Sequence, residues 1–376
     1  MIPMTPEELR RRHIRRSQYV SCNDAFIDVR LPGSSPKENY SIIGPGVTQN
    51  PGQVINLREP HGFNIGAAGL QPGITNNLHL HFTAEVFIIC EGRFRLRWGV
   101  TGDEGEVDVE PGDVVCMPPW MFRGFSNCGS TYGFLMTVLG GDDTGGIIWS
   151  PDVMQRARQT GLWLSKDNRL IEVSPGAPPP SADTLLPLMP QQDVKALRRW
   201  TATELLARCV RRGARDWRRA TLDSAVPGHG WELAPVAGWG LSQHRDQRPA
   251  VAEPLGFSLD WLRVPPGQRS APFLLEHTAV LIHEAGPLRV VFDGQVGPLH
   301  VDLGAWDTLS VPAGTRLQFV NLGDVAASAL LVVQGDARKV PRFDDQLVAQ
   351  AASHDAALDA GGHLARLSLL PPGMLA

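Results

Sequence analysis

The chain has 376 residues, of which 43% are hydrophobic and 20% are charged, and its formal net charge is −4 at pH 7. This composition is that of a globular protein, and it excludes collagen-like and disordered chains. No apolar run approaches the ~20 residues that span a bilayer, so a membrane protein is not expected. The 39 Gly and 31 Pro residues favour short strands over long helices.

The cysteines and the N-terminal segment indicate a cytoplasmic protein. The five cysteines form no CxxC pair, and their odd number argues against a disulfide framework. The first residues lack the apolar core of a signal peptide. The negative net charge gives no support for nucleic acid as the main partner. We interpret the basic stretch at residues 195–219 as a solvated helical face or an interdomain surface.

The predicted elements begin with a helix at residues 5–17, where Thr5 is the N-cap because Pro6 and two acidic residues follow it. Short apolar runs broken by Gly, Pro, Asn and Asp begin near residue 54 and return near residue 230. This texture predicts two β-sandwiches or barrels. Further helices are expected at residues 151–164, at residues 193–219 and in an Ala-rich segment from residue 343.

These elements divide the chain into five predicted parts, which are an N-terminal arm (1–53), a first barrel (54–145), a helical and Pro-rich linker (146–229), a second barrel (230–335) and a C-terminal tail (336–376).

An internal repeat relates the two β-rich regions at a constant offset of 194 residues, the difference 267 − 73. The recurring positions are mostly turn residues, namely Gly73/Gly267, Gly92/Gly286, Asp113/Asp307, Pro118/Pro312 and Asn127/Asn321. Because such residues have fixed backbone demands, their joint recurrence without a gap indicates two copies of one strand framework.

Residues 73–92 carry the pattern that points to chemistry. In a strand, side chains two apart share a face, so His79 and His81 point the same way. Glu85 begins the next predicted strand, from which its carboxylate can return to the imidazoles. Two imidazoles and a carboxylate form a facial set with open positions, which suits Fe(II), Mn(II), Ni(II) or Zn(II).

The spacing Gly-x5-His-x-His-x3-Glu-x6-Gly of this segment resembles the first motif of the cupin superfamily at every fixed position. The second cupin motif, Gly-x5-Pro-x-Gly-x2-His-x3-Asn, is matched by Gly112, Pro118 and Asn127. Trp120 stands at its second glycine and Arg123 at its histidine. Together with the repeat, the chain resembles a bicupin. The resemblance implies a mainly β fold of two double-stranded β-helix, or jelly-roll, barrels with a helical N-terminal arm and linker.

Arg123 stands where the family's remaining metal ligand is expected, and three arrangements are open. In the first, His79, His81 and Glu85 hold a metal, and Arg123 pairs with a substrate carboxylate in a pocket of charge about +2. In the second, Arg123 pairs directly with Glu85 and no metal binds. In the third, Arg123 faces outward and another group completes the site.

The second copy has lost these residue types, since the positions of His79, His81, Glu85 and Arg123 are taken by Phe273, Leu275, Ala279 and Leu317. We therefore expect a degenerate second barrel that is filled by side chains and holds no metal. His61, which precedes the first motif, is either a substitute ligand or acid/base group, or a structural histidine.

These observations predict a metal-dependent enzyme acting on a small anionic substrate, either an aromatic acid or a hydroxy or keto acid. The resemblance to bicupins of the gentisate 1,2-dioxygenase type implies an Fe(II) dioxygenase, with His79, His81 and Glu85 as metal ligands and Arg123 as a catalytic residue. Mn(II), Zn(II) or Ni(II) at the same residues would serve a decarboxylase, isomerase or hydrolase. A non-catalytic cupin that holds a small anion is the remaining alternative. We expect a homo-oligomer, such as a dimer.

Overall fold

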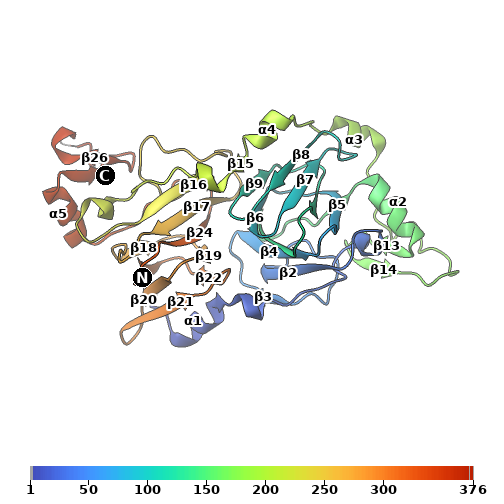
Figure 1. Ribbon diagram of the computed structural model, residues 1–376, viewed down its shortest axis with the longest axis horizontal. Coiled ribbons are helices and arrows are strands. Elements are labelled where there is room, and N and C mark those ends of the chain that lie inside the picture. The colour runs from blue at the N-terminus through green and yellow to red at the C-terminus, as the bar shows by residue number, and fades with distance from the viewer. Residues whose placement is uncertain (1–2, 372, 376) are drawn as a thin grey trace. The chain divides into compact units, whose positions relative to one another are not determined.

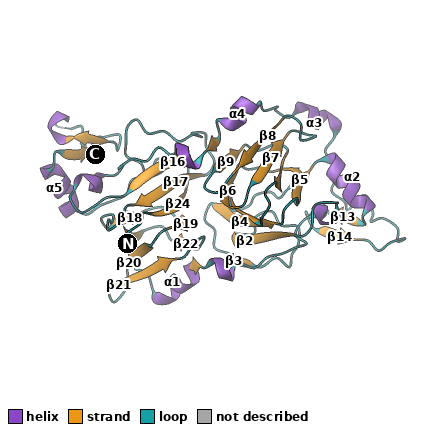
Figure 2. Ribbon diagram, viewed as in Figure 1, coloured by secondary structure: helices purple, strands orange, loops and turns teal. Residues whose placement is uncertain are grey.

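The computed structural model describes residues 3–371 and 373–375, and strands are the main regular secondary structure among them (Figures 1 and 2). Residues 1–2, 372 and 376, which belong to the predicted arm and tail, lie outside the described residues. The chain divides into two compact units. We call Tyr19–Arg212 the first unit, and Met1–Gln18 together with Gly213–Ala376 the second unit.

The first unit is built on a seven-stranded and a five-stranded sheet. The seven-stranded sheet contains, in spatial order, β15 (Cys209–Val210), β9 (Val114–Met117), β6 (Glu85–Glu91), β11 (Gly133–Gly140), β4 (Phe63–Leu70), β2 (Lys37–Ile43) and β3 (Ile55–Leu57). The five-stranded sheet contains β12 (Ile148–Trp149), β5 (Thr75–Leu80), β10 (Arg123–Asn127), β7 (Phe94–Trp98) and β8 (Gly105–Val109). Outside the two sheets lie η2 (Ile27–Arg30), α2 (Pro151–Gln159), β13 (Leu162–Leu164), β14 (Leu170–Glu172), α3 (Gln191–Ala196) and α4 (Ala202–Leu206).

The core of the first unit lies between these two sheets. It combines alternate residues of β6, such as Phe87 and Ile89, with alternate residues of β7, such as Leu96 and Trp98. This two-residue period is what a strand with one face on the core requires. The unit is therefore a closed β-sandwich of the jelly-roll kind.

The second unit repeats the same architecture with a six-stranded and a four-stranded sheet. The six-stranded sheet contains β1 (His13–Ile14), β22 (Thr308–Val311), β19 (Ala279–Ala285), β24 (Ala327–Gln334), β17 (Phe257–Val264) and β16 (Glu232–Ala237). The four-stranded sheet contains β18 (Phe273–Leu275), β23 (Thr315–Val320), β20 (Leu288–Asp293) and β21 (Pro298–Leu303). Outside them lie α1 (Pro6–Arg12), η1 (Arg16–Gln18), η4 (Leu222–Ala225), α5 (Asp345–Ser353), β25 (Ala356–Leu358), β26 (Leu364–Arg366) and η5 (Leu367–Leu369). A further 3-10 turn, η3 (Arg212–Ala214), spans the boundary between the two units.

The internal repeat extends beyond the strands that predicted it. The helix α2 and the hairpin β13–β14 recur as α5 and β25–β26, with starting residues that differ by 194 (345 − 151 and 356 − 162). These segments lie in the parts predicted as linker and tail. Each copy of the repeat therefore comprises a β-sandwich followed by a helix and a short hairpin.

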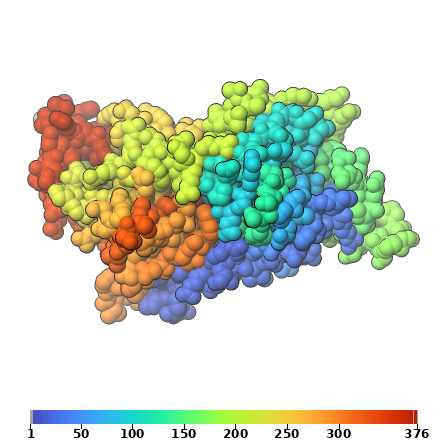
Figure 3. Space-filling view, in the orientation of Figure 1, coloured from blue at the N-terminus to red at the C-terminus, as the bar shows by residue number. Residues whose placement is uncertain are grey.

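Each unit completes its larger sheet with a short strand from the other half of the sequence. In the first unit, Cys209 of β15 pairs with Val115. In the second unit, His13 of β1 pairs with Leu309, the equivalent position (309 − 115 = 194). Figure 3 shows the blue N-terminal segment beside the orange strands of this unit. Because an open sheet edge exposes unpaired backbone groups, these two strands protect equivalent edges.

A repeated aspartate fixes each of these short strands. Asp113 accepts hydrogen bonds from Arg211 Nη1 at 2.7 Å and from the backbone N–H of Arg212 at 2.9 Å. Asp307 lies 2.8 Å from His13 Nε2 and accepts from the backbone N–H of Arg16 at 2.9 Å. The aspartates that marked the repeat in sequence are thus the residues that hold the edge strands.

The predicted helices are shorter in the structure. The N-terminal helix ends at Arg12 because His13 and Ile14 pair with β22, and the helix from Pro151 ends at Gln159 because β13 follows. The single basic helix predicted at residues 193–219 is wrong. That segment forms the short helices α3 and α4, and beyond them Arg208 Nε donates to the Cys116 carbonyl at 2.8 Å. Among the described residues, no helix combines the length and the apolar character needed to cross a membrane.

The strand β2 lies in the segment predicted as an arm, yet it forms part of the seven-stranded sheet. Its sequence, Lys-Glu-Asn-Tyr-Ser-Ile-Ile, begins with polar residues and follows a Pro- and Gly-rich stretch, so its period was not visible. It pairs with β4 in antiparallel register, from Lys37 opposite Leu70 to Ile43 opposite Ile65. The interior of the first unit therefore includes residues that precede residue 54.

A buried carboxyl in the second unit makes its stability depend on pH. Asp260, on β17, is fully buried, and its Oδ2 accepts a hydrogen bond from the backbone N–H of Leu241 at 2.9 Å. Burial raises the pKa of Asp260 from 3.8 to about 6. As the pH rises from about 4 to about 6, the unfolded chain releases this proton while the folded chain retains it, so the fold loses stability over this range.

The variant Asp260→Asn removes this ionisation. Between pH 5 and pH 7, we expect the free energy of unfolding of the wild type to fall by about 1 kcal/mol relative to that of the variant. Urea unfolding at the two pH values measures this difference. Asp324→Asn, which changes an exposed carboxylate of the same unit, is the control. Equal behaviour of the two variants would contradict the role of burial.

Candidate metal centre

Two histidines and a glutamate meet inside the first unit. One ligand atom from each of His79, His81 and Glu85 lies within 4.8 Å of the others, and all three residues are buried. In the described part of the chain, this is the one group of three or more His, Cys, Asp or Glu side chains with such spacing. The structure thus brings together the three residues that the sequence predicted as metal ligands.

The three residues come from both sheets. His79 lies on β5, and His81 follows the end of that strand. The bend at residues 82–84 carries the chain across to the seven-stranded sheet, where Glu85 begins β6. The strands β5 and β6 are therefore neighbours in sequence but lie in different sheets. The interior between the sheets is where the three side chains converge.

The histidines present their Nε2 atoms to the group. The Nδ1 atom of His79 lies 2.7 Å from the Asn77 carbonyl oxygen, and that of His81 lies 3.3 Å from the Gly146 carbonyl oxygen. A carbonyl accepts only, so each Nδ1 carries the proton and each Nε2 keeps its lone pair. Burial, followed by the charge of Arg123, lowers the pKa of His79 to about 3 and that of His81 well below 6.5. Both rings are therefore neutral at pH 7, as metal ligands must be.

Arg123 pairs directly with Glu85. Its Nε and Nη2 both donate to Glu85 Oε2 at 3.2 Å, and its Nη1 donates to the Met121 carbonyl at 3.1 Å. The guanidinium is fully buried. Burial raises the pKa of Glu85, and the adjacent Arg123 charge opposes this rise. Of the three arrangements open for Arg123, the outward-facing one is wrong, and the ion pair of the second arrangement is present.

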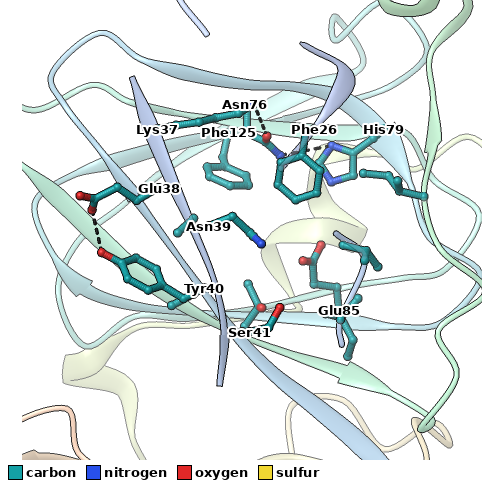
Figure 4. A pocket seen from close by; sticks show the side chains of 18 of the residues that line it. Phe26, Lys37, Glu38, Asn39, Tyr40, Ser41, Asn76, His79, Glu85 and Phe125 are labelled. Carbon is teal, nitrogen blue, oxygen red and sulfur yellow. Dashed lines mark hydrogen bonds between the residues drawn. The ribbon is translucent and has the colours of Figure 1, made fainter. Parts of the chain in front are cut away.

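A small cavity lies beside the three candidate ligands (Figure 4). Its volume is about 50 Å³, room for roughly three to five waters. His79, His81 and Glu85 line it, and Arg123 is not among its lining residues. The predicted direct contact between Arg123 and a substrate therefore lacks a surface in this cavity, and the arginine instead holds Glu85.

The cavity also has walls that the sequence did not predict. Phe26 and residues 37–41 line it together with Asn76. Phe26 and residues 37–41 were missed because residues 1–53 were interpreted as an arm outside the barrel. A signal was available in the sequence, because the repeat offset aligns Lys37 with Trp231 of the second copy (231 − 37 = 194). This alignment places residue 37 inside the repeated framework rather than in an arm.

Trp120 adopts the backbone conformation that the motif's glycine would supply. Its φ is 56°, and the equivalent residue of the second copy, Gly314, has a φ of 76°. Both backbone N–H groups donate to equivalent carbonyls, that of His81 at 2.9 Å and that of Leu275 at 2.8 Å. A tryptophan with positive φ is strained, and Trp306 of the second unit, with a φ of 61°, carries the same strain.

The other candidates are placed away from the cavity. His61 is buried, its Nδ1 lies 2.7 Å from the Glu59 carbonyl oxygen, and it does not line the cavity, so its role as a substitute ligand is wrong. In the second unit, the residues equivalent to the site all lie in the hydrophobic core, namely Phe273, Leu275, Ala279 and Leu317.

The residues present fit a divalent cation. Two neutral imidazole nitrogens and a carboxylate are the donors that Mn(II), Fe(II), Ni(II) and Zn(II) accept, and their facial grouping leaves positions for a substrate. The carbonyls behind both Nδ1 atoms are the outer partners that orient metal-binding histidines.

Comparison with known proteins identifies this fold. Residues 67–139 match the family model described as a cupin domain. No curated protein matches the chain by sequence.

Among solved structures, the chain is similar to oxalate decarboxylases and to a vicilin. The Lactobacillus farciminis oxalate decarboxylase in its formate complex superposes with a TM-score of 0.51 at 13% identity, covering 87% of each chain. The Bacillus subtilis oxalate decarboxylase at pH 4.6 gives 0.52 at 14% identity, covering 93% of this chain and 87% of that one. Vicilin from hazelnut, Corylus avellana, gives 0.51 at 10% identity, covering 88% and 87%. The chain therefore contains a cupin domain at residues 67–139 and has the jelly-roll fold of the cupins in two copies, as bicupins do.

Proposed function

We propose that the first unit holds a divalent cation at His79, His81 and Glu85, and that the protein is a metal-dependent enzyme acting on a small carboxylic acid without net oxidation, as a decarboxylase does. The observation that carries the proposal is the buried group of three ligand atoms within 4.8 Å, beside a small cavity. The similar oxalate decarboxylases support this class of reaction, and one of them is described as having Mn(II) centres.

The charges of the first unit favour an anionic substrate. The Glu85 carboxylate is balanced by Arg123, and both histidines are neutral, so the site without a cation is close to neutral. A divalent cation would supply Lewis acidity towards a carboxylate oxygen and a charge of about +2 in a buried space. Such a charge is stable only when an anion compensates it.

The residues around the cavity hold the candidate ligands in fixed orientations and shield them from bulk water. Arg123 fixes one oxygen of Glu85 through two hydrogen bonds, and Asn77 and Gly146 fix the two imidazoles. All three candidate ligands are at most 4% exposed, so bulk water has little access to them. A fixed set of donors shielded from bulk solvent strengthens electrostatic interactions with a bound acid.

Two other functions remain as competitors. The Fe(II) dioxygenase implied by the gentisate-type resemblance would use the same ligands, but the similar structures favour a non-oxidative reaction with Mn(II). A non-catalytic cupin is favoured by the Arg123–Glu85 ion pair, which satisfies the carboxylate without a metal.

Metal binding is the first test. The purified protein is expected to bind about one equivalent of Mn(II) per chain, and His81→Ala is expected to weaken this binding at least about tenfold because a ligand is lost. Elemental analysis and Mn(II) electron paramagnetic resonance measure both quantities. His277→Ala, in the second unit, is the matched control. Less than about a tenth of an equivalent after anaerobic loading with Mn(II) or Fe(II) would overturn the proposal.

The reaction class is tested with the loaded protein. Small mono- and dicarboxylic acids are supplied, and released CO2 and consumed O2 are measured together. We expect CO2 release without stoichiometric O2 uptake, and loss of this activity in His81→Ala. Stoichiometric O2 uptake with the Fe(II)-loaded protein would identify a dioxygenase. Full metal occupancy without turnover of any acid would identify a binding protein.

Arg123 is tested through stability. Arg123→Met leaves the buried Glu85 carboxylate without its counter-charge, which is expected to lower the free energy of unfolding of the metal-free protein by about 3–5 kcal/mol. Added Mn(II) compensates the carboxylate and is expected to restore part of this loss, which thermal unfolding with and without the metal measures. Arg95→Met, at a half-exposed ion pair of the same unit, is the control. A loss that Mn(II) does not reduce would contradict Glu85 as a ligand.

A further inference from the structure

A second buried cation, Lys37, lines the cavity. It lies at the start of β2, is 5% exposed, and stands among the lining residues with His79, His81 and Glu85. Its ammonium donates to Asp28 Oδ1 and to Asn76 Oδ1, the latter at 2.8 Å. Figure 4 shows Lys37 beside Asn76, which lies next to His79, with Glu85 further along the cavity.

The two cations of the site therefore differ in what they can reach. Arg123 is used by Glu85 and the Met121 carbonyl and does not line the cavity. Lys37 does line it, and an ammonium has three N–H donors, of which Asp28 and Asn76 take two. Lys37 is thus the one lysine or arginine among the described residues that line the cavity.

The second copy of the repeat shows that the fold does not require this lysine. Trp231 occupies the equivalent position (231 − 37 = 194) and stacks on Phe273, with ring centroids 5.6 Å apart and an interplanar angle of 11°. Phe273 is itself the residue at the position of His79 (273 − 79 = 194). The second copy therefore has a phenylalanine at the position of the candidate ligand His79 and a tryptophan at the position of Lys37.

The aspartate that pairs with Lys37, unlike the lysine itself, has a counterpart in the second copy. Asp28 Oδ2 accepts from the backbone N–H of Asn77 at 3.1 Å, and Asp223 Oδ2 accepts from that of Ala271, the equivalent residue (271 − 77 = 194), at 2.8 Å. In the second copy, Trp231 Nε1 also donates to Asp223, at 3.0 Å, although this aspartate stands one residue off the repeat offset (223 − 28 = 195). Both copies thus keep an aspartate that clamps the strand and a side chain that donates to it, and only the copy with the candidate ligands uses a cation as that donor.

We propose that Lys37 is a specificity-determining residue, which binds the second anionic group of a dicarboxylic acid whose first carboxylate lies at His79, His81 and Glu85. This proposal rests on the proposed function, and it narrows the substrate class from small acids to small dianions. A loaded site of charge about +2 is balanced by a dianion, and one N–H of a fixed ammonium provides a directed contact for its second carboxylate.

The test compares malonate, which has two carboxylates, with acetate, which has one. Dissociation constants are measured for the full chain by calorimetry and by the shift in thermal unfolding, with and without Mn(II). The main variant is Lys37→Met/Asp28→Asn, which removes both buried charges together and so leaves no unpaired carboxylate. Lys37→Arg keeps the charge, and Lys166→Met, at an exposed lysine of the same unit, is the control.

We expect the double variant to bind malonate about tenfold or more weakly, with acetate and Mn(II) affinities changed less than about twofold. Lys37→Arg should retain part of the preference for malonate, and Lys166→Met should behave as the wild type. An equal loss for malonate and acetate, or a loss of Mn(II) affinity without a change in preference, would overturn the proposal, because Lys37 would then act on His79 through Asn76.

The outcome for Lys37 is separable from the outcome for the metal. Failure of the wild type to bind Mn(II) would overturn the proposed function, while the malonate shift of the metal-free protein would still report on Lys37. Failure of malonate to shift the wild type in either condition would overturn the role of Lys37, whatever the metal content.

Discussion

The ion pair between Glu85 and Arg123 is the interaction on which the interior of the first unit depends. The carboxylate belongs to β6 of one sheet and the guanidinium to β10 of the other, so the pair joins the two layers across the core. Neither charge reaches water, and each is tolerable only because the other is present. The second unit has Ala279 and Leu317 at these positions, so the two charges are absent together there.

The ion pair also affects the charge state and the number of metal ligands in the site. Burial, and after it the Arg123 charge, lowers the pKa of His79 and of His81, so both rings stay neutral and their Nε2 lone pairs remain available. A third histidine in place of Arg123 would have supplied another ligand but no charge for Glu85. With Arg123 at this position, the site lacks a third histidine ligand, but its Glu85 carboxylate is held in a fixed orientation. The chemistry of this site is therefore that of three donors with a counter-charge behind them.

Much of the fold could be predicted from the sequence, because strand alternation and turn residues are local signals. The repeat of 194 residues located both sandwiches, and the spacing of His79, His81 and Glu85 located the candidate ligands. The direction of Arg123 could not be predicted, since a strand residue next to a carboxylate can pair with it or with a substrate at similar cost. Lys37 was missed because a buried lysine looks like a surface lysine until its surroundings are known.

The ends of the helices and the domain limits were harder to predict from the sequence, for a different reason. Residues 13–14 and 209–210 become strands because a distant sheet edge accepts them, and no local pattern in two residues can indicate this. The predicted helix at residues 5–17 accordingly ran past its true end at Arg12. Tertiary pairing, in these segments, overrides local propensity.

The exchange of edge strands also sets an order for chain synthesis. The segment at residues 13–14 has its partner at residues 308–309, so it must wait until most of the chain has left the ribosome. The first unit closes earlier, since β15 lies at residues 209–210 and pairs with residues 114–115. Until then, residues 13–14 lack the sheet edge with which they pair in the folded chain. The arginines at residues 10–12 place positive charge directly beside this unpaired strand, and charged side chains at such a position disfavour pairing with another chain.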